Sequence, residues 1–158
     1  MEPIAYARII GNKSTPNLRG IAYFYRARGN GLFVEVEVSG LPENKAGFYG
    51  LHIHENGDCT IPFDKTGGHY NPYNVPHPEH AGDLPPLLGN NGYAYSCFYT
   101  SRLTPADIMK RSIIIHSGPD DFTSQPAGNS GNKIGCGVIR TFQRPMMDAP
   151  TNGMTDKI

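Results

Sequence analysis

The sequence predicts an all-β domain in which short antiparallel strands form a sandwich or a barrel. Glycine and proline are abundant, with 19 and 14 among 158 residues, so turns must be frequent. Short apolar or alternating segments recur between these turns, which is typical of such folds. Only residues 104–110 have a helical pattern, with Thr104 as a cap and Pro105 in the first turn. At this length we expect one domain with a substantial core.

Three strands are expected in the first forty residues. Residues 3–10 are short and apolar, and residues 19–28 alternate loosely. Residues 32–39 alternate most clearly, with valines on one face and glutamates on the other. The Arg-Gly-Asn-Gly sequence before this strand predicts a hairpin turn.

Four further strands are expected, and two long segments interrupt them. The strands are residues 47–55, residues 92–100 after an Asn-Gly turn, residues 111–116 and residues 134–140. Long connections without secondary structure, here 56–91 and 117–133, are uncommon unless they carry a function.

Composition and charge exclude several classes of function. Lys plus Arg equals Asp plus Glu at 14 each, and no basic stripe indicates nucleic-acid binding. No apolar run is long enough for a membrane span. No leader is visible, so we expect a cytoplasmic protein, or an exported one if a leader has been removed. We assign residues 1–140 to the domain and expect a weakly ordered tail over residues 141–158, which are polar with Pro and Gly.

All six histidines have spacings that suit metal ligation. His52 and His54 are two apart on an expected strand, so they point to one face while Leu51 and Ile53 point into the core. Histidine is the commonest transition-metal ligand. Such a pair alone would indicate a surface strand more often than a metal site.

The first long segment contains a second set of metal-type side chains. His69, His77, His80 and Asp83 lie within 15 positions of one another (83 − 69 + 1). Three histidines and one carboxylate make a closed tetrahedral set that suits structural zinc. Asp83 alone could instead cap a turn, because Gly-Asp is a turn signal.

A copper set is suggested by His116, before the second long segment, together with the His52–His54 pair. His116 ends an apolar strand and can join His52 and His54. Copper(II) prefers a roughly square-planar arrangement, so a fourth ligand is needed. His69 could provide it if its deprotonated ring bridges both metals.

These residues stand in motifs that resemble the copper–zinc superoxide dismutase family. HIHENGDC, GGHYNP, HAGDLP, IIIHSGPDD and GNSGNKIGCGVI follow one another in the family's order between about residues 4 and 140. The compact run HPEHAGDLPP resembles the bacterial branch. The resemblance implies a flattened, eight-stranded antiparallel Greek-key barrel, an immunoglobulin-like sandwich with two long functional loops.

The resemblance also implies the metal ligands, position by position. The copper ligands would be His52, His54, His69 and His116, and the zinc ligands His69, His77, His80 and Asp83. His69 would be the shared, bridging imidazolate. Copper and zinc are therefore the expected cofactors.

Other family positions are Asp120, Cys59 and Cys136. Asp120 matches a carboxylate that links ligands of the two metals, although alone it would be only a solvated loop acid. Cys59 and Cys136 match the family's disulfide; counted alone, three cysteines allow at most one internal pair. Cys97 is expected to be a packed, inert thiol.

Lys133 occupies the position where the family usually has an arginine, at the mouth of the copper channel. Lysine keeps the charge that attracts superoxide but lacks the planar two-donor fork. Residues 122–127 lack the charged side chains of animal members, so steering of the anion is expected to be weaker or built differently.

The function implied is dismutation of superoxide to O₂ and H₂O₂ by alternating copper(II) and copper(I). His69 would be the bridging ligand and proton shuttle, and Lys133 would attract the anion. The alternative is a non-catalytic metal-binding or copper-chaperone relative, against which stand the complete copper set and the absence of a CxxC motif. A structural module would not need seven metal-type ligands. The tyrosines of residues 92–100 permit a homodimer.

Overall fold

The computed structural model describes residues 1–143, which are almost entirely β-structure. Within them, seven strands follow one antiparallel path, in the order β5-β8-β9-β1-β2-β3-β7, and β10 pairs with β1. The strands of this sheet are β1 (Ala5–Gly11), β2 (Arg19–Arg26), β3 (Leu32–Ser39), β5 (Leu51–His54), β7 (Ala94–Thr100), β8 (Ser112–His116), β9 (Lys133–Val138) and β10 (Arg140–Thr141). A separate small sheet pairs β4 (Phe48–Tyr49) with β6 (Leu87–Leu88).

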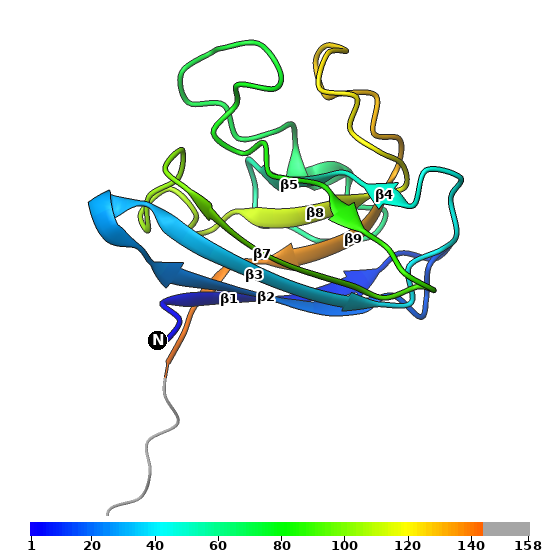
Figure 1. Cartoon of the computed structure of the whole chain (residues 1–158), viewed down its shortest axis with the longest axis horizontal. Helices are drawn as coiled ribbons and strands as arrows, with labels where there is room; N and C mark the ends of the chain where they lie inside the picture. The colour runs from blue at the N-terminus through cyan, green and yellow to red at the C-terminus, as the bar shows by residue number, and fades with distance from the viewer. Residues whose placement is uncertain (144–158) are drawn as a thin grey trace, which may run out of the picture.

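The sheet curls so that β1, β2 and β3 form one layer and β5, β8 and β9 lie across from it (Figure 1). Sheet neighbours are often distant in sequence, since β5 pairs with β8 and β9 pairs with β1, as Greek-key connections require. The all-β, antiparallel prediction is confirmed. Both long loops extend from the β5–β8–β9 side of the molecule (Figure 1).

The main core fills the space between the layers. Val34, Val36 and Val38 are buried on one face of β3, while Glu35 and Glu37 lie on the other, as predicted. The facing layer contributes fully buried side chains to the same core: Leu51, Ile53, Ile113 and Ile115.

A smaller apolar cluster lies on the opposite face of β8 and β9. Phe63, Ile114 and Cys136 are each 0% exposed, and Cys59 packs against them. Phe63 precedes the 3-10 turn η2 (Asp64–Thr66), so the first long loop covers this face of the sheet. Ile114 pairs with His52 on one side and with Cys136 on the other, so the cluster adjoins the histidines.

The predicted helix over residues 104–110 is wrong, because these residues form turns. The start signal is present: the Thr104 amide donates to Asp107 Oδ2 at 2.8 Å and the Asp107 amide approaches Thr104 Oγ1 at 3.4 Å. Lys110 then adopts a φ of 61°, which right-handed helices exclude. The chain therefore makes one capped turn and does not continue as a helix.

Two predicted strands are each divided in the structure. Residues 47–55 form β4 and β5 in different sheets, separated at Gly50, whose amide donates to the Gly118 carbonyl at 2.8 Å. Residues 134–140 contribute to both β9 and β10. Of the predicted tail, residues 144–158 lie outside the described residues, whereas Thr141 pairs with Ala5. No helix among residues 1–143 is long and apolar enough to cross a membrane.

Candidate metal centre

Strand β5 presents two histidines to the face opposite the core. Leu51 and Ile53 are 0% exposed within the core, and His52 and His54 alternate with them. An isolated bridge between His54 and His69 brings the first long loop against this strand. The predicted alternation along β5 is therefore present, and covering by the loop buries both imidazoles.

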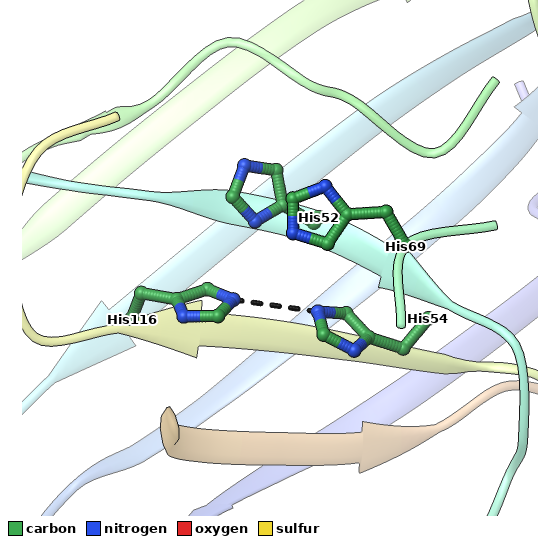
Figure 2. Close-up of side chains that lie close together, drawn as sticks. All are labelled: His52, His54, His69 and His116. Atoms are coloured by element: carbon green, nitrogen blue, oxygen red, sulfur yellow. Dashed lines mark hydrogen bonds between the residues drawn. The ribbon is translucent and has the colours of Figure 1, made fainter. Parts of the chain in front are cut away.

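Four histidines form what we call the strand cluster: His52, His54, His69 and His116. One ligand-type nitrogen from each lies within 4.8 Å of the others. In Figure 2 the rings converge from β5, from the end of β8 and from the loop, and His54 Nε2 lies 3.3 Å from His116 Nε2. Burial lowers the pKa of His52 and His54, and lowers that of His116 to about 3. Neutral imidazoles keep a lone pair for a metal.

A second group, the loop cluster, consists of His69, His77, His80 and Asp83. Asp83 Oδ1 lies 2.7 Å from His69 Nδ1, and Oδ2 lies 3.0 Å from His77 Nδ1 and 3.2 Å from His80 Nδ1. Burial alone would raise the pKa of Asp83, but the His69 hydrogen bond and the neighbouring histidines hold it below its ordinary value. Three Nδ1 atoms and a carboxylate thus converge on one point.

His69 belongs to both clusters and uses a different nitrogen in each. Its Nδ1 faces Asp83, while its Nε2 is buried without a hydrogen-bond partner. His52 Nδ1 and His77 Nδ1 are also unpartnered, the latter because its approach to Asp83 lies outside hydrogen-bond geometry. An unpaired buried polar atom costs about 1–3 kcal/mol. Metal ions would satisfy these nitrogens, so the residues fit copper in the strand cluster and tetrahedral zinc in the loop cluster.

The Asp120 carboxylate contacts one histidine of each cluster. Its Oδ2 lies 2.8 Å from His52 Nε2 and its Oδ1 lies 2.8 Å from His77 Nε2. Burial would raise the pKa of this carboxyl, but hydrogen bonds from both rings hold it well below its ordinary range. An ionised acceptor keeps the proton of each ring on Nε2, which leaves each Nδ1 lone pair free.

Lys133 contacts the loop beside the strand cluster. Its Nζ donates to Thr66 Oγ1 and to the Gly67 carbonyl, both at 2.9 Å. His54 Nδ1 contacts the same carbonyl at 2.8 Å, so Lys133 and His54 share an acceptor. Burial lowers the pKa of Lys133 below its ordinary value, and the nearby charge of Asp64 offsets part of this shift. Lys133 also lines a cavity of about 690 Å³ with Asp64 and Asn132.

Sequence analysis missed two residues that contact the first long loop, Gln125 and Arg111. Gln125 Oε1 accepts from the His77 amide at 2.9 Å, and its Nε2 donates to the His77 carbonyl at 2.7 Å. Arg111 lies over the Tyr70 ring at 3.5 Å, next to His69. A glutamine in an irregular loop follows no periodic pattern, so sequence offers no signal for it.

The predicted disulfide between Cys59 and Cys136 is confirmed, with the Cα atoms 5.7 Å apart. It ties the first long loop to β9. Cys97 is free and exposed, so the expectation of a packed thiol is wrong. It pairs with Glu35 across β3 and β7, on the face that points away from the core.

The chain is similar to a protein-family model, to known proteins and to solved structures. Residues 18–139 match the family model described as copper/zinc superoxide dismutase (SODC). A "Superoxide dismutase [Cu-Zn]" of Deinococcus radiodurans is 42% identical over 134 residues, which cover 71% of this chain and 72% of the relative. The human "Copper chaperone for superoxide dismutase" is 30% identical over 168 residues, which cover 96% of this chain and 60% of the chaperone. A crystal structure of a SOD-like protein from Bacillus subtilis superposes with a TM-score of 0.72 at 29% identity, covering 84% of this chain and 96% of that one.

Proposed function

Because the chain belongs to the copper/zinc superoxide dismutase family, we propose that it dismutes superoxide, with copper in the strand cluster and zinc in the loop cluster. The observation that carries the proposal is the position of His69. One imidazole lies in both clusters, with Nδ1 toward Asp83 and a buried, unpartnered Nε2 left for the other metal. A shared ring is hard to explain for a single structural metal.

The chain's own residues would bind, orient and move protons. Copper would supply reversible one-electron transfer between superoxide molecules, and zinc a fixed positive charge beside His69. Formation of H₂O₂ takes up two protons, of which His69 would deliver one from Nε2 and water the other. Asp120 would keep His52 and His77 in the tautomer that binds metal.

Lys133 would serve two purposes in this proposal. Its ammonium would attract the superoxide anion toward the strand cluster. Its hydrogen bonds to Thr66 and Gly67 would hold the loop whose carbonyl orients His54. An ammonium lacks the planar fork of a guanidinium, so it would guide the anion as a point charge.

The second candidate is a metal-binding or copper-chaperone role without turnover. The likeness to the human copper chaperone for superoxide dismutase favours it. The deciding experiment measures superoxide consumption by protein loaded with copper and zinc, with metal content determined on the same sample. Rapid copper-dependent turnover supports the dismutase; no turnover in protein that holds both metals would leave the metal-carrying role.

A matched pair of variants separates the two clusters. His116→Ala removes a ligand of the strand cluster alone, and His80→Ala a ligand of the loop cluster alone. We expect the first variant to lose copper and turnover while it keeps zinc, and the second to lose zinc first. Equal loss of both metals in both variants would contradict the assignment.

The homodimer also belongs to this proposal. Tyr95 and Tyr99 on β7 are 55% and 50% exposed, and Phe33 packs against Tyr99 with ring centroids 5.7 Å apart. Exposed tyrosines of this kind are enriched at interfaces. Sedimentation of the metal-loaded protein would test it.

A further inference from the structure

A cavity of about 240 Å³ opens over the disulfide and shares no lining residue with either metal cluster. Its floor is formed by the neighbouring strands β1 and β9, where Ile10 pairs with Cys136. Both bridged cysteines line it, together with Ile10, Val138, Arg8 and Arg140. The volume suits a small molecule of a few heavy atoms.

Among residues 1–143, the charged side chains that line this cavity are both positive. Arg8 and Arg140 line it, and within residues 1–143 neither guanidinium has a hydrogen bond or an ion pair. No acidic side chain of the described chain lines it. Asp58, next to Cys59, is turned toward Thr60, whose amide and hydroxyl donate to its Oδ1 at 3.0 and 2.6 Å. Two free guanidinium groups in a concave site attract small anions.

The two sulfurs differ in access. Cys136 is 0% exposed and sits beneath Phe63, whereas Cys59 is only partly buried. Thiol–disulfide exchange requires a thiolate to reach one sulfur while the other leaves. A molecule in the cavity would therefore reach Cys59, and Cys136 would be the leaving group.

We infer that this cavity is a binding site for small thiols that carry a second negative group, and that it delivers them to Cys59. The arginines would hold the carboxylate or sulfonate. The thiolate attacks Cys59 Sγ, the bond to Cys136 breaks, and Cys136 leaves as a thiolate that takes a proton. A second thiol then attacks the mixed disulfide. The sum is one protein disulfide plus two thiols giving two protein thiols and one small disulfide, a two-electron reduction. The inference does not depend on the proposed dismutation.

The test compares three small thiols on the metal-loaded protein in a Cys97→Ser background. The probes are 2-mercaptoethanesulfonate, which is anionic, 2-mercaptoethanol, which is neutral, and cysteamine, which is cationic. Bridge opening is followed as the mass added by an alkylating reagent. Each rate is taken at equal thiolate concentration and divided by that thiol's rate on an uncharged disulfide peptide.

We expect the anionic thiol to open the bridge about tenfold faster than the cationic one, because a cationic cleft raises the local anion concentration about 10-fold or more. Arg8→Gln and Arg140→Gln should each reduce that ratio, and ethanesulfonate, which has no thiol, should slow the anionic thiol. Arg26→Gln is the matched control, since Arg26 is exposed at the end of β2 and does not line the cavity. A ratio near one in the unsubstituted protein, or an equal fall in all three variants, would overturn the inference.

Discussion

Asp120→Asn should weaken metal binding through the tautomers of two histidines. In the structure, one carboxylate accepts from His52 Nε2 and from His77 Nε2, each at 2.8 Å. Asparagine offers one acceptor oxygen and one NH₂ donor, so it can satisfy only one of the two rings. The other ring must lose the hydrogen bond or move its proton to Nδ1, the buried nitrogen that is left for a metal.

The expected loss is about 10- to 100-fold in affinity for at least one metal, the usual effect of removing such a partner. That is about 1.4–2.7 kcal/mol. The assay is competition with a chelator, which gives a dissociation constant for copper and for zinc separately. Asp121→Asn is the matched control, because it removes the same charge at the next position. Within residues 1–143, the exposed Asp121 carboxylate accepts hydrogen bonds only from Thr123 and Ser124. If Asp120→Asn leaves both constants within twofold of the unsubstituted protein, the tautomer argument is refuted.

Three further changes have defined outcomes. Lys133→Met should lower kcat/KM for superoxide about tenfold and flatten its dependence on salt, because the attracting charge is gone; stopped-flow kinetics would check this, and Lys133→Arg should restore it. Gly128→Ala should cost about 1–2 kcal/mol in denaturant unfolding, because Gly128 has a φ of +68°. It should also weaken zinc binding, since the added Cβ would strike Asp120 Oδ1 and His77 Nε2. Burial and the hydrogen bond to Glu35 raise the pKa of Tyr25 to about 12, so its contribution to stability is complete below pH 10 and is lost as pH rises toward 12. The pKa of Tyr49, Tyr70, Tyr93 and Tyr95 is also raised, so ultraviolet titration should show several late tyrosines, one fewer after Tyr25→Phe. A variant that titrates identically would contradict this.

The strands with regular alternation were predictable, and those that depend on distant contacts were not. The valines and glutamates of β3 define its two faces without further information. The division of residues 47–55 depends on a hydrogen bond from Gly50 to Gly118, which no local pattern contains. The helix prediction failed at Lys110, where the backbone turns left-handed after a proper cap. Two-residue strands such as β6 are too short to show any period.

The candidate site was predictable where side-chain type restricts chemistry, and unpredictable where the backbone acts. Histidines and an aspartate at metal-ligand spacing identified both clusters, which the structure assembles within 4.8 Å. The Gly67 carbonyl, shared by His54 and Lys133, could not be found, because every residue has a carbonyl. Likewise the outward direction of Cys97 follows from its register opposite Glu35, which the sequence of β7 alone does not specify.

One row of side chains across the sheet has a consequence for proton transfer. His52, Ile114 and Cys136 are paired across β5, β8 and β9, so adjacent-strand spacing puts the imidazole and the disulfide about 10 Å apart. Between them stands the saturated side chain of Ile114, which is 0% exposed and packs in one cluster with Phe63. This hydrocarbon excludes water and contains no group that could relay a proton. The histidine clusters and the disulfide can therefore occupy one face of one sheet without exchanging protons through the side chains between them.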